Sequence, residues 1–132
     1  MLPLRYARSW LVMGVLILLI GLILTLSPLP SGTPSFNDKV VHATGFFGFM
    51  LWFGGLFENR RLPLVALALS GYGVLIEMLQ ALTPARQAEG LDLVADVAGV
   101  LLGWLVCAAG LSRWCTTLES WLVPQNPGAG NP

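Results

Sequence analysis

The chain has 132 residues, of which 55% are hydrophobic and 11% are charged, and its mean hydropathy is +0.74. A soluble domain usually carries about a quarter charged residues, so this composition excludes an ordinary soluble domain and predicts an integral membrane protein. Seven basic residues balance seven acidic ones, so the chain has no basic field to hold nucleic acid, and we expect no nucleic-acid partner.

The first predicted membrane span covers residues 10–27. Two arginines precede an apolar run that begins at Trp10, which is also the pattern of a secretory signal. The run is long for a signal and no Ala-x-Ala-like cleavage site follows it, so we interpret it as an uncleaved helix. Gly14 and Gly21 lie on one face of this helix, a spacing that suits close contact with another helix.

Three further spans are predicted at residues 40–57, 62–82 and 92–111, separated by short polar or proline-containing connections. Asn37 or Asp38 is the predicted N-cap of the first of these, because both side chains accept hydrogen bonds from helix N–H groups. The predicted fold class is therefore all-α: a polytopic membrane protein with a four-transmembrane-helix bundle.

The basic residues predict how the bundle is oriented. With the N-terminus in the cytoplasm, five arginines lie inside, and Lys39 and Arg86 lie outside, which is the bias expected of short loops. Residues 1–111 then form a transmembrane domain with both termini cytoplasmic. Residues 112–123 carry apolar side chains at helical spacing, which fits an amphipathic interfacial helix or a short extension of the fourth span. Residues 124–132 are predicted to be disordered.

Polar residues occur within the predicted spans, on helix faces that also carry small residues. An Asp at the centre of a membrane helix costs roughly 2.5–3.5 kcal/mol on insertion scales, so such residues usually mark a function or a buried pairing. Gly73, Gly99 and Gly103 share these faces and predict helix–helix contact there. The alternating topology brings the polar ends of three spans together, which predicts an outward-facing pocket formed by Lys39, His42, Glu77, Gln80, Arg86, Asp92 and Asp96.

The pocket residues allow functional and structural interpretations. Glu77 suits a general acid or base, or an acceptor for a sugar headgroup, but also an ion pair that joins three helices. His42 suits a proton shuttle or a packing contact with a carboxylate. Arg86 and Lys39 suit a phosphate, or else a solvated loop charge and a cation that reaches the membrane interface. Asp92 is a further candidate N-cap.

Two other kinds of chemistry are weakly supported by the residues. A divalent ion could be held by His42 together with Glu77, Asp92 and Asp96. No His-x-x-x-His or Cys pair supports zinc, so the sequence predicts neither a metal nor a cofactor. The two cysteines, both near the C-terminus, are predicted to be packing residues and not catalytic thiols or disulfide partners.

Four polar motifs follow one another between residues 38 and 103. They are Asp38-Lys39-x-x-His42, Ile76-Glu77-x-x-Gln80, Pro84-x-Arg86, and Asp92-x-x-x-Asp96-x-x-Gly99-x-x-x-Gly103. In this order they resemble the VanZ-like family of small bacterial membrane proteins. One position departs from the family, which commonly has Asn where this chain has Asp96.

The resemblance implies a multi-pass protein of the bacterial cytoplasmic (inner) membrane and cell envelope. The name-giving member is linked to resistance to teicoplanin, a glycopeptide antibiotic. The implied ligand is a lipid-linked or cell-wall glycan, such as an undecaprenyl-linked or peptidoglycan-type molecule. The pocket would bind or process it, with protons handled by Glu77, His42 and Asp96 and the ligand held by Asp38, Lys39, Gln80, Arg86 and Asp92.

Two further functions remain open from the sequence. The chain could be an accessory or assembly protein whose polar cluster is an interhelical lock, with a second copy or another envelope protein as its partner. It could also be a small transporter or proton channel, although a polar cluster on one side of the membrane argues against that. Whether the protein catalyses any reaction stays open.

Overall fold

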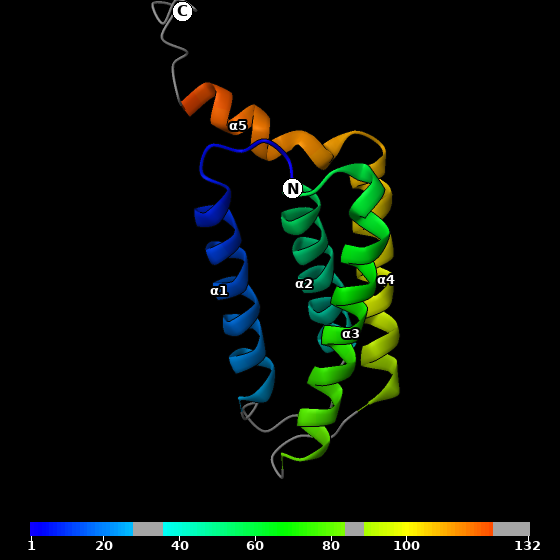
Figure 1. Cartoon of the computed structure of the whole chain (residues 1–132). Helices are drawn as coiled ribbons and strands as arrows, with labels where there is room; N and C mark the ends of the chain where they lie inside the picture. Colours follow the sequence, from blue (N-terminus) through cyan, green and yellow to red (C-terminus); the bar gives the residue numbers. More distant parts are fainter. Residues whose placement is uncertain (28–35, 84–88, 123–132) are drawn as a thin grey trace, which may run out of the picture.

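A computed structural model describes residues 1–27, 36–83 and 89–122 (Figure 1). Its helices are α1 (Ala7–Leu26), α2 (Phe36–Gly54), α3 (Leu62–Ala81), α4 (Gly90–Ala108) and α5 (Trp114–Leu122), with 3-10 turns at Asn59–Arg61 and Leu111–Arg113. The described ranges contain no strand, which confirms the all-α prediction. The predicted disorder of residues 124–132 lies outside the described residues.

Both predicted N-caps are wrong. Helix α2 begins at Phe36, so Asp38 lies in its first turn, where a carboxylate interacts favourably with the positive end of the helix dipole. Helix α4 begins at Gly90 after the N-cap residue Glu89, so Asp92 also lies in a first turn.

Three helical segments are long and apolar enough to cross a membrane: Ala7–Leu26, Asn59–Ala81 and Gly90–Ala108. Helix α2 has a comparable 19 residues, but polar side chains, including Lys39 and His42, occupy its first two turns. Large apolar side chains remain exposed along the three apolar segments, and lipid is the solvent that suits them. These segments indicate a membrane protein.

Helices α2 and α4 make the closest contact in the bundle. A Cβ atom added to Gly99 would collide with the carbonyl oxygen of Ala43, and one added to Gly103 would lie 2.7 Å from the Cβ of Met50. The backbone of α2 occupies the space that a side chain at Gly99 would need, and the Met50 side chain together with the Phe47 carbonyl oxygen occupies that space at Gly103. The same seam continues at Cys107, which is fully buried.

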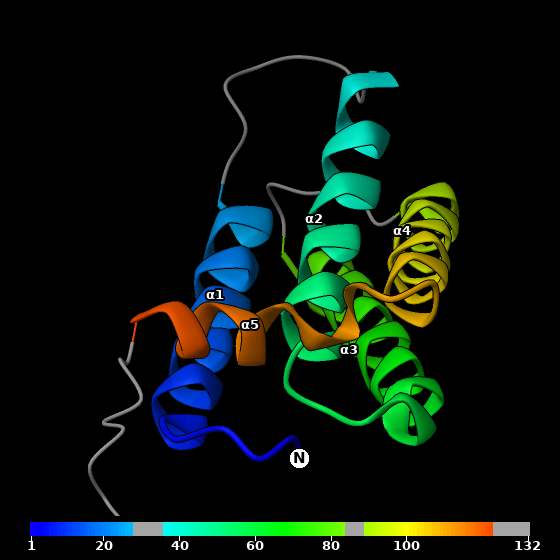
Figure 2. The ribbon, with the colours of Figure 1, turned by 90° about the horizontal axis from the view of Figure 1, so that it is seen from above.

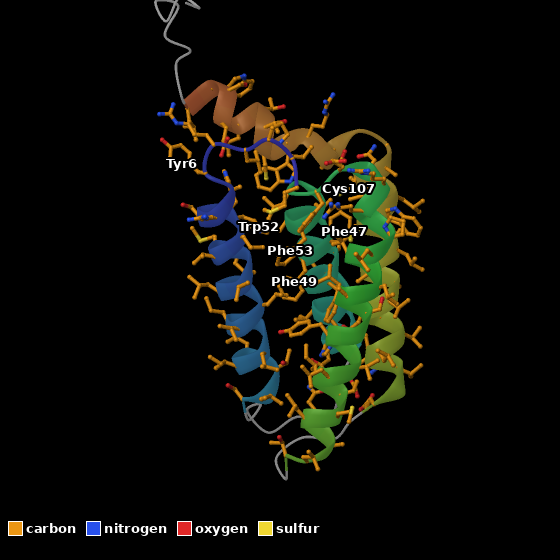
Figure 3. The ribbon with its side chains drawn as sticks, in the orientation of Figure 1. Tyr6, Phe47, Phe49, Trp52, Phe53 and Cys107 are labelled. Carbon is orange, nitrogen blue, oxygen red and sulfur yellow. The ribbon has the colours of Figure 1, made fainter. Side chains whose placement is uncertain are left out.

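Helix α1 stands at the side of the bundle and packs mainly against aromatic side chains of α2. Figure 3 shows Phe49, Trp52 and Phe53 between these two helices. Gly14 faces Trp52 and Phe53, and Gly21 faces Phe49, so the two glycines make room for the rings. Lipid-facing residues make up most of α1, and Gly14 is its one buried residue.

Helix α5 lies across the end of the bundle at which the described chain begins (Figure 2). It starts after Gly110, whose φ of 130° ends α4 three residues before the predicted end of that span. The Glu119 carboxylate of α5 accepts hydrogen bonds from the N–H groups of Arg5 and Tyr6, at 2.7 and 3.0 Å, and from the Trp10 indole at 2.8 Å.

Three indole rings pack together where α5 meets the end of the bundle, with centroids 5.5 to 5.6 Å apart. We call these rings, from Trp10, Trp52 and Trp114, together with Glu119, the aromatic end. Burial, with an added effect of the Glu119 charge, raises the pKa of the neighbouring Cys115 thiol to about 12. Both cysteines are buried and form no disulfide, so they pack as small apolar residues.

Candidate functional site

Polar side chains gather at the opposite end of the bundle from α5. They come from the first turns of α2, the last turns of α3 and the first turns of α4, so three helix ends meet there. We call the following set the polar end: Asp38, Lys39, His42, Glu77, Gln80, Glu89, Asp92 and Asp96. Arg86, which the sequence placed in the same pocket, lies outside the described residues.

His42 and Asp96 form a buried pair between α2 and α4. The Nδ1 atom of His42 lies 2.9 Å from Oδ1 of Asp96, and the two residues are 6% and 0% exposed. A carboxylate bonded to one ring nitrogen fixes the orientation of an imidazole and leaves the other nitrogen for a second partner. Within the part of the chain that the structure describes, Nε2 of His42 makes no hydrogen bond.

Lys39 links the same two helices nearer the surface. Its Nζ atom lies 2.7 Å from Oε2 of Glu89 and 3.0 Å from Oδ1 of Asp92. The ammonium group is therefore already paired with two carboxylates and is not free to hold a phosphate. Glu89 is not among the predicted site residues, although its position one helical turn before Asp92 is the signal that would have placed it there.

Glu77, like Asp38, forms no ion pair with any described residue, and its carboxylate accepts a hydrogen bond from the Glu89 backbone N–H. It is close enough to His42, Asp92 and Asp96 for their charges to act on it. The predicted ion pair through Glu77 that would join three helices is therefore not found among the described residues. The ionic contacts that do form there join α2 to α4 and its N-cap.

Three oxygen atoms at the polar end are buried and have no hydrogen-bond partner: Oε1 of Glu77, Oε1 of Gln80 and Oδ2 of Asp96. Gln80 uses its amide nitrogen to donate to the Thr25 carbonyl of α1, at 3.1 Å. Asp96 directs Oδ2 toward Gly73, where an added Cβ would lie 3.0 Å away. An unsatisfied buried polar atom costs about 1–3 kcal/mol, so three of them in one place call for an explanation.

The polar end also contains a group of potential metal ligands. One ligand atom from each of Asp38, His42 and Asp92 lies within 4.8 Å of the other two. From the sequence, His42 and Asp92 are possible ligands together with Glu77 and Asp96, whereas the structure groups them with Asp38. The first turns of α2 bring Asp38 and His42 together because they are four residues apart.

An apolar groove of about 330 Å³ opens on the side of the bundle between α1 and α3. It extends from Arg61 at the start of α3 to Tyr72, whose hydroxyl donates to the Leu18 carbonyl of α1 at 2.6 Å. The groove is lined by Leu11, Leu18, Phe53, Phe57, Arg61, Leu64, Val65, Ala68, Leu69 and Tyr72. Its walls suit a hydrocarbon chain.

No protein-family model matches the chain, and neither a curated protein nor a solved structure matches it. The likeness to VanZ-like proteins therefore rests on the four motifs between residues 38 and 103.

Proposed function

We propose that the chain is a VanZ-like protein of the bacterial cytoplasmic membrane whose polar end binds the headgroup of a lipid-linked or cell-wall glycan. In this proposal α2 is a fourth span, both termini are cytoplasmic, and the polar end opens to the exterior. The observation that carries it is the set of three buried, unpartnered oxygens on Glu77, Gln80 and Asp96.

The chemistry of these three atoms favours a sugar. All of them are oxygens without a described donor, and a carboxylate or amide oxygen accepts hydrogen bonds. Sugar hydroxyl groups are donors that would satisfy them, whereas phosphate oxygens would add further acceptors. Lys39 is already held by Glu89 and Asp92, so the described residues offer more to the glycan than to the phosphate of such a ligand.

The apolar groove is consistent with a lipid anchor on the ligand. It ends at Tyr72, five residues before Glu77, which is about 7 Å along α3 at 1.5 Å per residue. A hydrocarbon chain attached to a headgroup at the polar end would reach the groove after extending over this distance along the bundle. Processing of the ligand would use the Glu77 carboxylate to take up a proton from a bound hydroxyl group.

Native mass spectrometry of the protein released from its own membranes tests this proposal. We expect the wild type to retain a glycan-bearing lipid, and the Glu77→Gln variant to lose at least nine tenths of it while folding normally. The matched control is Glu58→Gln at the other end of the bundle, where the Glu58 carboxylate pairs with Arg60 at the surface. Bare wild-type protein, or equal retention in Glu77→Gln, would refute the proposal. Resistance to a glycopeptide antibiotic should decrease in the same variant.

An accessory or assembly protein is a second candidate function. The His42–Asp96 pair and the contacts of Lys39 with Glu89 and Asp92 join helix α2 to α4 and its N-cap, as an interhelical lock would. This function predicts that Asp96→Ala lowers stability and breaks a complex with a membrane partner, while no variant changes a bound lipid. If the wild type retains a lipid that Glu77→Gln loses, the accessory function is excluded.

A further inference from the structure

We infer that Asp38, His42 and Asp92 form a binding site for a divalent transition-metal cation. Their ligand atoms lie within 4.8 Å of one another, two from successive turns of α2 and one from the facing turn of α4. Ligand atoms around one tetrahedral cation at about 2.0–2.2 Å stand about 3.3–3.6 Å apart, so side-chain movements of up to about 1 Å complete the site. The inference does not depend on the glycan proposed above.

The Asp96 carboxylate supplies independent support for this site. It is fully buried and holds Nδ1 of His42 at 2.9 Å. Histidines that bind metals almost always donate their other ring N–H to a carboxylate or carbonyl in this way, which fixes the tautomer and makes the free nitrogen a better ligand. His42 is more than nine-tenths buried, and its Nε2 atom has no hydrogen-bond partner in the described parts of the chain.

The local charge also favours a cation. Asp38, Asp92 and Asp96 surround His42, and each of them acts on it electrostatically. Among the described residues, Lys39 is the basic side chain that pairs with this group, and it bonds one oxygen of Asp92 while also bonding Glu89. The second oxygen of Asp92 makes no hydrogen bond with a described residue and can bind a metal, and a divalent ion would balance the excess negative charge.

The ligand types narrow the choice of metal. One imidazole with two carboxylates suits zinc or manganese, because imidazole suits Zn²⁺ and carboxylates suit Mn²⁺, whereas Mg²⁺ and Ca²⁺ prefer oxygen ligands throughout. Three protein ligands also leave an open coordination position, as catalytic zinc sites do. A hydroxyl group or a water molecule would bind there.

Metal titration of the full chain in detergent tests the inference. Chelator-treated protein would be titrated with Zn²⁺ alone and Mn²⁺ alone against a chromophoric competitor, and bound metal would be counted by elemental mass spectrometry. We expect one ion per chain. Asp38→Asn and His42→Gln should weaken binding about 100-fold, and Asp96→Asn, which changes a positioning residue, about 10- to 100-fold. Glu58→Gln is the matched control and should bind as the wild type does.

Lys39→Gln gives a prediction of opposite sign. It removes a positive charge 3.0 Å from Asp92 and frees a ligand oxygen, so binding of Zn²⁺ should become about tenfold tighter. The variant that is safest for folding is Asp38→Asn, because Asp38 is half-exposed and makes no ion pair with a described residue. Equal affinity in wild type and Asp38→Asn, or weaker binding in Lys39→Gln, would overturn the site, as would wild-type protein that retains no metal. The lipid measurement above is separate, so either proposal can fail alone.

Discussion

Hydrogen bonds of charged side chains join the helices at both ends of the bundle, but only the aromatic end pairs all of its described buried polar side-chain atoms. At the aromatic end, Glu119 accepts three hydrogen bonds, and the indole N–H groups of Trp52 and Trp114 donate to carbonyl oxygens of Trp10 and Leu51. At the polar end, His42, Lys39 and their partners join α2 to α4, yet three buried oxygens stay without a partner. Among the described residues, every buried side-chain nitrogen or oxygen atom without a hydrogen-bond partner lies at this end.

The two ends differ in whether their buried polar atoms have hydrogen-bond partners. The aromatic end closes the bundle and leaves no described buried side-chain polar atom unsatisfied, as expected where packing is the sole requirement. Five of the eight residues of the polar end carry carboxylates, so acceptor oxygens outnumber donors there, and three buried oxygens stay unpaired. Such atoms are costly in the protein alone and become favourable when a ligand supplies donors.

The largest loss of stability is expected at the close contact between α2 and α4, which runs between the two ends. Gly99→Ala places a methyl group against the Ala43 carbonyl oxygen, which belongs to the backbone and cannot rotate away. We expect a loss of about 1–3 kcal/mol in the free energy of unfolding, measured by denaturant titration in micelles. Gly71→Ala on α3 is the control, because an added Cβ there meets nothing within 4 Å. Equal stability of the two variants would contradict the close α2–α4 contact.

A smaller effect is expected from Glu119→Gln at the aromatic end. Glutamine has one acceptor oxygen where the carboxylate has two, and it has no charge, so it cannot serve the Arg5, Tyr6 and Trp10 donors equally well. We expect a loss of roughly 1 kcal/mol in the free energy of unfolding, followed by tryptophan fluorescence. Unchanged stability would show that water replaces these hydrogen bonds without cost.

Acid should weaken the same contact in the wild type. Burial by itself raises the pKa of Glu119, but the hydrogen bonds from Arg5, Tyr6 and Trp10 outweigh it and hold the pKa below its ordinary value of 4.5. A pKa lowered by folding means that the contact is at full strength above pH 4.5 and is lost as the pH falls through the lower folded-state value.

The indole N–H resonance of Trp10 reports this titration. We expect it to shift, and its hydrogen exchange to quicken, only at pH values below 4.5. Glu119→Gln should show the exposed-like resonance at every pH. A transition that persists in that variant would assign the effect to another carboxylate.

The smallest change in stability is expected from Glu77→Gln at the polar end. Glu77 makes no ion pair with a described residue, and one of its oxygens has no partner. The free energy of unfolding should therefore change by no more than about 0.5 kcal/mol. A loss larger than that of Glu119→Gln would mean that Glu77 supports the bundle, and the contrast between the two ends would not hold.

The helices themselves could be predicted well from the sequence. Apolar runs of about 20 residues separated by polar or proline-containing connections identify helices for a simple reason: backbone groups in lipid must bond within their own segment. The start of α2 was placed four residues late, at Val40 instead of Phe36. Hydropathy locates apolar residues, whereas the end of a helix depends on backbone hydrogen bonds that polar residues make equally well.

The site was only partly predictable. Helical spacing placed His42, Glu77, Gln80, Asp92 and Asp96 at one end, because residues three or four apart share a face. Spacing along one helix says nothing about which residue of a neighbouring helix is opposite it. Only the structure therefore shows that His42 pairs with Asp96 and that Lys39 pairs with Glu89 and Asp92. It also shows that Glu77 pairs with neither His42 nor Lys39.

Composition and periodicity by themselves determined that this is an all-helical membrane protein with a polar cluster at one end of its bundle. Those properties follow from the solvent and from the geometry of a single helix, so a sequence is enough to read them. The tertiary structure decided which polar atoms are paired and which are left open. That outcome depends on how far α2, α3 and α4 approach one another, and the close contact at Gly99 and Gly103 sets the α2–α4 approach.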